Sequence, residues 1–203
     1  MERREFVKAG LLCLPFIGLS GWLVNDRLEK LSDITDSRGR VYLRPPGALP
    51  EKEFISTCIK CGRCGEVCPN DTLNFFDEIS SPALVGTPYF IPREKACMLC
   101  MKCTQICPSG ALVKVESDDG DVISKVVKIG TAEVDKNICN SYNGIACGVC
   151  VRACPYSGIA LSAETWERPV VNVAACVGCG LCEQICIHAP QAIRVKPAGI
   201  QRV

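Results

Sequence analysis

The sequence has little histidine, few aromatic residues and almost no net charge. One His occurs in 203 residues, aromatic residues make up 6%, and the formal net charge is +1. A single His makes a Ser-His-Asp or Cys-His catalytic set untenable, and His188 follows Cys186 too closely to complete the C-x-x-C-H motif of covalent haem. No Gly-rich loop follows a strand to hold a nucleotide, and the balanced charge gives no reason to expect nucleic acid. We therefore expect no catalytic site in this chain.

Cysteine is the abundant residue. There are 17 Cys in the chain, and an odd number cannot be paired completely by disulfides within it. Sixteen of them form four short motifs, and only Cys13 is left over. The motifs are Cys58, Cys61, Cys64 and Cys68 (residues 58–68); Cys97, Cys100, Cys103 and Cys107 (97–107); Cys139, Cys147, Cys150 and Cys154 (139–154); and Cys176, Cys179, Cys182 and Cys186 (176–186).

The spacing of the motifs predicts [4Fe–4S] clusters. The first, second and fourth motifs read C-x2-C-x2-C-x3-C, and the third reads C-x7-C-x2-C-x3-C. A Pro follows the last Cys of every motif except the fourth. In this pattern three thiolates bind one cluster, and the fourth ligates the other cluster of a pair. We also expect the fourth Cys and its Pro to start a helix. Zinc would favour separated C-x2-C pairs, and disulfides are disfavoured by the crowding of the thiols. All sixteen Cys are therefore predicted iron ligands of four [4Fe–4S] clusters.

The motifs recur with a period near 40 residues, and β-like runs flank each of them. The fold class predicted is α+β, with two bacterial-ferredoxin-like modules of small strands and short helices around the clusters, in tandem or nested. Residues 118–121 are predicted to form a hairpin turn between Val-rich strands. The aromatic segment 70–95 is interpreted as a loop that covers the first or second cluster, with a partner-docking surface as the alternative.

The spacing does not decide how the motifs pair. If the first motif pairs with the second, Cys68 joins the cluster of Cys97; if it pairs with the fourth, Cys68 joins that of Cys176. Glycines within the motifs are expected to let backbone N–H groups reach the sulfur atoms. These glycines are Gly62, Gly65, Gly148, Gly178 and Gly180.

The N-terminus predicts export. Residues 1–25 contain Arg3 and Arg4, then Phe6, Lys8 and an apolar run to Val24, which is the pattern of a twin-arginine signal. This route carries folded cargo, and it would spare the thiols an unfolded passage into an oxidising compartment. An uncleaved signal would be a membrane anchor. Residues 26–52 are interpreted as a polar, Pro-containing spacer, and residues 53–203 as the four-cluster region.

The twin-arginine start, the four motifs and the wide third motif together resemble the NapG/MauM family of ferredoxin-type proteins. The stretch from Ile129 to Cys147 and the Ile187 that stands in place of a Pro after Cys186 carry the closest likeness. The resemblance implies a periplasmic electron carrier at the outer face of the cytoplasmic membrane. Its partners would be a quinol-oxidising membrane subunit (NapH-like) and a periplasmic reductase, such as nitrate reductase, or a cytochrome.

Two other functions compete with this one. The chain could be the iron–sulfur subunit bound directly to a molybdopterin oxidoreductase, and analogy with such four-cluster subunits favours nested pairing of motif one with four and two with three. It could also be an accessory protein for reductase maturation, although a twin-arginine signal argues against a protein that stays in the cytoplasm.

Overall fold

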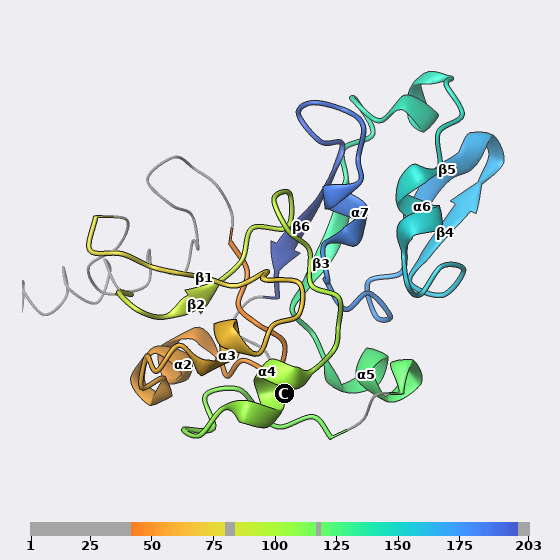
Figure 1. Ribbon diagram of the computed structural model, residues 1–203. Coiled ribbons are helices and arrows are strands. Elements are labelled where there is room, and N and C mark those ends of the chain that lie inside the picture. The colour runs from red at the N-terminus through yellow and green to blue at the C-terminus, as the bar shows by residue number, and fades with distance from the viewer. Residues whose placement is uncertain (1–41, 80–83, 117–118, 199–203) are drawn as a thin grey trace, which may run out of the picture. The chain divides into compact units, whose positions relative to one another are not determined.

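A computed structural model describes residues 42–79, 84–116 and 119–198 (Figure 1). All of them fall within one compact unit of the chain. The elements are short, and their order is α2 (Glu51–Thr57), α3 (Arg63–Glu66), β1 (Asn74–Phe75), β2 (Pro88–Tyr89), α4 (Lys102–Ile106), α5 (Gly120–Val126), β3 (Gly130–Val134), η1 (Asn140–Asn143), α6 (Val149–Ala153), β4 (Leu161–Glu164), η2 (Thr165–Glu167), β5 (Arg168–Val171), α7 (Leu181–Gln184) and β6 (Ile193–Pro197). We call residues 42–116 the first half and residues 130–197 the second half.

The second half is built on two antiparallel strand pairs. β3 pairs with β6, from Gly130 opposite Pro197 to Val134 opposite Ile193, and β4 pairs with β5. Along β6 the side chains alternate between buried and exposed, as the pattern of Ile193 and Val195 predicts. The strands predicted on both sides of the second half's motifs are therefore present, with β4 beginning only at Leu161.

The first half has less sheet and a small aromatic cluster. β1 and β2 form a two-residue antiparallel pair, and the rings of Phe76 and Tyr89 stack with centroids 4.1 Å apart. Phe90 is fully buried and its backbone bridges to Leu43. The run predicted as a strand around Val113 makes only an isolated bridge, and Val113 itself is exposed. Most of the aromatic residues predicted to cover a cluster thus form core instead.

The predicted spacer does not extend over residues 42–52. Leu43 is fully buried, its N–H donates to Phe90 O at 2.8 Å, and Arg44 is 1% exposed in the core of the first half. Pro45 and Pro46 are also fully buried. The prolines that suggested an extended linker therefore fix the path of a segment that belongs to the folded first half.

The hairpin turn predicted at residues 118–121 is wrong over its described residues, because Gly120 and Asp121 begin the helix α5. Asp119 is the N-cap of α5 and its carboxylate accepts from the N–H of Asp121 at 2.9 Å. An Asp at this position satisfies a free N–H of the first helical turn. Ile123 is buried, while Val122 and Val126 are exposed, so one apolar residue per turn anchors the helix.

The two halves contact each other between residues 92–97 and the α7 region. The guanidinium Nη1 of Arg93 donates to the carbonyls of Glu183, Gln184 and Cys186 at 3.2, 3.1 and 2.7 Å. Beside it, the N–H of Cys97 donates to the carbonyl of Cys179 at 2.9 Å. These bonds join a motif of the first half directly to a motif of the second.

Residues 1–41, on which the twin-arginine signal and most of the spacer were predicted, lie outside the described residues. Within the part of the chain that the structure describes, no helix has the length and apolar character to cross a bilayer.

Candidate iron–sulfur sites

In the three tightly spaced motifs, the residues on both sides of the second Cys have left-handed backbone conformation. In the first motif Lys60 and Gly62 flank Cys61 with φ of 58° and 76°. The second motif has Leu99 and Met101 at these positions, and the fourth has Gly178 and Gly180, all with positive φ. Alternating left-handed residues curl a short loop, which is why three thiols so near in sequence can face one space.

A short helical turn follows each loop, but not where we predicted it. The helices α3, α4, α6 and α7 carry the third Cys of each motif and end before the fourth or at it. Cys107 and Cys154, each followed by Pro, have extended backbone with ψ of 112° and 125°. A residue before Pro is disfavoured in the helical region, so the Pro ends the helix rather than starting one.

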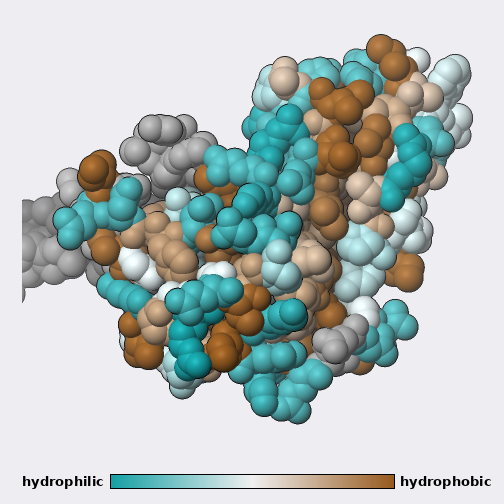
Figure 2. Space-filling model, viewed as in Figure 1, coloured by the Kyte–Doolittle hydropathy of each residue, from teal (hydrophilic) through white to brown (hydrophobic). Residues whose placement is uncertain are grey.

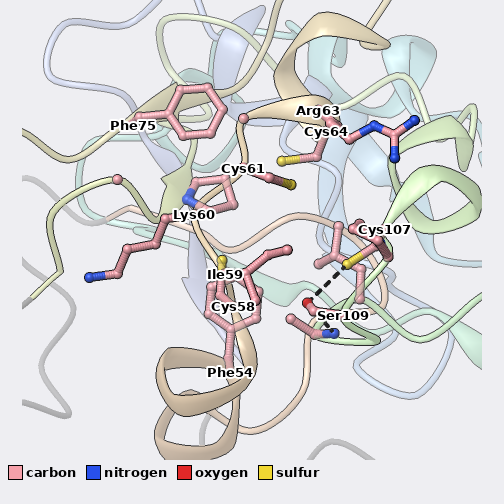
Figure 3. A pocket seen from close by; sticks show the side chains of 16 residues that line it. Phe54, Cys58, Ile59, Lys60, Cys61, Arg63, Cys64, Phe75, Cys107 and Ser109 are labelled. Atoms are coloured by element: carbon pink, nitrogen blue, oxygen red, sulfur yellow. Dashed lines mark hydrogen bonds between the residues drawn. The ribbon is translucent and has the colours of Figure 1, made fainter.

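The first group of thiols, site A, draws on both motifs of the first half. Its four cysteines line one pocket, and their sulfur atoms surround the same space in Figure 3: Cys58, Cys61, Cys64 and Cys107. Phe75 also lines this pocket and lies close to the backbone of Gly65. The prediction that segment 70–95 covers the first or second cluster is met in part, because Phe75, Gly86 and Pro88 line site A, and Thr72 and Leu73 line the pocket of the second group. Cys61 is exposed, unlike the other fifteen described thiols.

The second group, site B, is the complement of site A. Its thiols line one pocket together with Thr72 and Met101, and they are Cys68, Cys97, Cys100 and Cys103. Burial is the main cause that raises the pKa of Cys97 to about 12, and the nearby charges of Cys100 and Cys68 add to it. Thus Cys68 from the first motif lies with three cysteines of the second.

The second half repeats this exchange. One pocket, site C, is lined by Cys139, Cys147, Cys150 and Cys186. The remaining four, site D, are Cys154, Cys176, Cys179 and Cys182. Burial, and after it the charges of neighbouring thiols that include the other three of site D, raise the pKa of Cys182.

The structure therefore groups the thiols in tandem, first motif with second and third with fourth. The nested grouping that analogy favoured would place Cys68 near Cys176, and the thiol positions contradict it. All sixteen predicted cysteines lie in one of the four sites, and none of the described cysteines forms a disulfide.

The electrostatics of the sites fit bound iron. Burial raises the pKa of Cys64, Cys150 and Cys179 to about 11, so these thiols are poor anions without a cation beside them. Iron–sulfur clusters supply that charge and favour soft thiolate ligands. Among the described residues, no three His, Cys, Asp or Glu side chains converge to hold a single metal ion. Four thiols that line one pocket fit a cluster in sites A, B and C, and the four neighbouring thiols of site D fit one as well.

Hydrogen bonds to the sulfur atoms come partly from residues that the sequence analysis missed. Thr72 N–H donates to Cys68 Sγ, Leu99 N–H to Cys97 Sγ and Ala192 N–H to Cys186 Sγ, each at 3.4 Å. Of the predicted glycine donors, Gly65 donates to Cys64. The donors to sulfur are not restricted to glycine, because every non-proline residue in these turns has a backbone N–H that it can donate.

Several hydrogen-bond donors surround the sulfur atom of Cys107 in site A. Burial acts to raise its pKa, but donors on Leu112, Ser109 and Gly110 outweigh burial and lower the pKa of Cys107 below its usual value. The Ser109 hydroxyl lies 3.6 Å from Cys107 Sγ, as the dashed line in Figure 3 shows. A Ser two residues after a ligand Cys is a signal that the sequence contained and that we did not use.

Paired thiol groups that exchange their fourth cysteine, held by short helices and strands, define the class of ferredoxin-type iron–sulfur proteins. A model of the 4Fe-4S dicluster domain matches residues 57–142 and 143–189. The methylamine utilization ferredoxin-type protein MauM of Paracoccus denitrificans is 39% identical over 94% of this chain and 83% of its own length. MauM of Methylophilus methylotrophus is 40% identical over 81% of this chain and 75% of its own. The ferredoxin-type protein NapG of Escherichia coli is 38% identical over 80% and 73%. The chain belongs to the MauM/NapG family of ferredoxin-type proteins, as its motifs predicted.

Proposed function

We propose that this chain is an electron carrier with four [4Fe–4S] clusters, one in each of sites A to D. The observation that carries the proposal is the sorting of all sixteen motif cysteines into four groups of four. A bound cluster of this type takes up and releases one electron. The protein's own contribution is to hold the thiols, to bury them and to direct N–H groups at the sulfur atoms.

The contacts between sites support an order of A, B, D and C. Sites A and B exchange cysteines within the first half, and C and D do so within the second. The two halves meet where the N–H of Cys97 in site B donates to the carbonyl of Cys179 in site D. Sites A and C would then be the ends of the series. Cys61 makes site A the more accessible end.

The partners we propose are a quinol-oxidising membrane subunit (NapH-like) as donor and a periplasmic reductase or cytochrome as acceptor. The NapG and MauM relatives support a role of this type, and the predicted twin-arginine signal supports export of the folded protein to the periplasm. Exposed apolar residues of the second half offer contact surface to a partner. They are Ile145, Ile159, Trp166, Val173, Ile185 and Ile187. Figure 2 shows hydrophobic residues gathered in a band on the viewed face.

The test is metal analysis of protein purified without oxygen. About sixteen iron and sixteen acid-labile sulfide per chain, with spin-coupled signals in the EPR spectrum after reduction, are expected for four clusters. About twelve in fully loaded protein would contradict the proposal and remove one site. Variants test the tandem grouping: Cys107→Ala should perturb the same EPR signal as Cys58→Ala, and Cys68→Ala a different one.

Membranes test the partner. Membranes that contain the NapH-like subunit should reduce the loaded protein when a quinol is added, and membranes without that subunit should not. Co-purification with a large molybdenum-containing subunit, without any reduction by quinol, would instead favour the directly bound subunit. Recovery of the protein in the cytoplasmic fraction would favour the maturation role.

A further inference from the structure

Ser141 carries a buried hydroxyl without a hydrogen-bond partner. Ser141 is 1% exposed. Among the described residues, Ser141 Oγ is the one buried side-chain nitrogen or oxygen atom for which no hydrogen-bond partner is found. Such a group loses its hydrogen bonds to water on folding, so leaving it unpaired is unfavourable. Ser141 lines the pocket of site C beside Cys139 and Cys186. The pocket is therefore the place where a missing acceptor would lie.

The wide third motif fixes Ser141 in that position. The seven residues between Cys139 and Cys147 contain η1, which includes Ser141 and has Cys139 as its N-cap. Asn143 Nδ2 donates to the carbonyl of Cys139 at 2.8 Å, and Arg168 Nε donates to the carbonyl of Ser141 at 3.4 Å. Both bonds hold the backbone on either side of the hydroxyl. The longer loop is thus an ordered structure, and it brings a polar side chain into a mainly apolar pocket.

Site A contains a comparable Ser hydroxyl within hydrogen-bond distance of a motif Cys. Ser109 stands two residues after Cys107, and its hydroxyl lies 3.6 Å from Cys107 Sγ. Ser141 stands two residues after Cys139. The Ser109 hydroxyl also accepts from Ala111 N–H, whereas Ser141 Oγ has no such second partner. A sulfur acceptor at site C would complete the parallel.

We propose that the Ser141 hydroxyl donates a hydrogen bond to the iron–sulfur cluster of site C and raises its reduction potential. This inference rests on the proposed function, because it requires a cluster in site C. A donor to a sulfur atom stabilises the reduced cluster more than the oxidised one, since reduction adds negative charge to the acceptor. Ser141 is a positioning and tuning residue, and it does not ligate iron.

The test compares four forms of the intact, iron-loaded protein: wild type, Ser141→Ala, Ser141→Thr and Ser124→Ala. Ser124 is a matched control because its hydroxyl donates to Asp121 O on the exposed surface of α5. Potentials are measured by EPR-monitored redox titration. We expect one of the four potentials to become more negative in Ser141→Ala and all four to stay in place in Ser124→Ala. Thr, which keeps the hydroxyl, should restore the original value.

A second measurement identifies the proton. Pulsed electron–nuclear double resonance in deuterated buffer should detect an exchangeable deuteron near one cluster in wild type, and Ser141→Ala should lose it. Four unchanged potentials in the fully loaded variant would overturn the proposal, and so would an unchanged deuteron signal. If Thr proves too large for the site, the deuteron signals of wild type and Ser141→Ala are sufficient to decide whether the Ser141 hydroxyl is the donor. Iron content separates the two levels: full loading without any shift refutes only the role of Ser141, while a missing fourth cluster refutes the proposed function.

Discussion

Replacing Arg44 with Met should loosen the first half locally and strongly. Arg44 is 1% exposed, and its guanidinium pairs with the Glu51 carboxylate at 2.5 Å. It also donates to Thr87 Oγ1 at 3.0 Å and to Pro88 O at 2.7 Å, and it lies 4.8 Å above the ring of Phe54. The Met side chain replaces the aliphatic part of the Arg side chain, but it is shorter and supplies none of these donors. Glu51, whose side chain is 17% exposed, would then keep its negative charge without the Arg44 cation beside it.

Breaking a buried ion pair by removing one partner costs about 3–5 kcal/mol. We take the lower end, about 3 kcal/mol, because Glu51 retains some contact with water. At about 1.4 kcal/mol per factor of ten, the equilibrium for local opening should shift by about 150-fold. The double variant Arg44→Met with Glu51→Met should recover much of this loss, since neither side chain then leaves a buried charge unpaired.

Native-state hydrogen exchange of the iron-loaded protein measures this opening without complete unfolding. Peptides containing Leu43 and Phe90, whose backbones bond to each other at 2.8 and 2.9 Å, should exchange about 150-fold faster in Arg44→Met. Peptides from residues 130–197 should not change. A change below about fivefold at Leu43, or an equal acceleration of both halves, would show that the buried cation does not stabilise the first half in this way.

Three further pairs of variants test the site geometry. Gly62 and Gly178 share a φ of 76°, but a Cβ would meet nothing within 4 Å at Gly62 and the Gly130 backbone nitrogen at 2.3 Å at Gly178. Gly62→Ala should therefore cost only the left-handed strain, about 1–2 kcal/mol, whereas Gly178→Ala should also lose iron from site D, as metal analysis would show. Arg93→Met removes three carbonyl hydrogen bonds between the halves and should lower the thermal midpoint of the loaded protein, while Lys95→Met, which removes an exposed pair with Asp71, should not. Asn143 Nδ2 donates to Cys139 O beside site C, and Asn70 Nδ2 donates to Ala96 O beside site B. Asn143→Ala should therefore release iron from site C, and Asn70→Ala should release it from site B. Loss from the same site in both variants would contradict these assignments.

Cysteine spacing predicts most of the observed thiol grouping, because thiols that lie together are mostly local in sequence. Three of the four thiols in each site lie in one motif, so chain order nearly determines the site. The fourth thiol depends on how two motifs pack, and spacing is the same for either pairing. Contacts such as Cys97 N–H to Cys179 O decide how the halves meet, and they involve backbone groups that every residue has.

The fold predictions were wrong where contacts with distant residues outweighed the local sequence preference. Val-rich sequence around Gly120 favours strands, but Asp119 caps a helix and Ile123 finds a place in the core. Prolines near residue 45 favour an extended linker, but Arg44 and Leu43 beside them are buried by residues 84–90. Neither outcome is visible in the local sequence, since the deciding partners lie far along the chain.

The left-handed positions show why identical motif geometry does not require identical residues. Met101 has φ of 53° and is fully buried, and Leu99 has φ of 58° and is 9% exposed. Each pays the strain of a non-glycine residue, about 1–2 kcal/mol, and burial of a large apolar side chain returns a similar amount. At Gly178 burial of a side chain cannot offset the strain, because the backbone of Gly130 occupies the space that a side chain would need. Gly178 therefore marks the close approach of β3, whereas Gly62, where a Cβ would meet nothing within 4 Å, serves only the left-handed turn. The second motif can use Leu and Met at these positions because their side chains are buried.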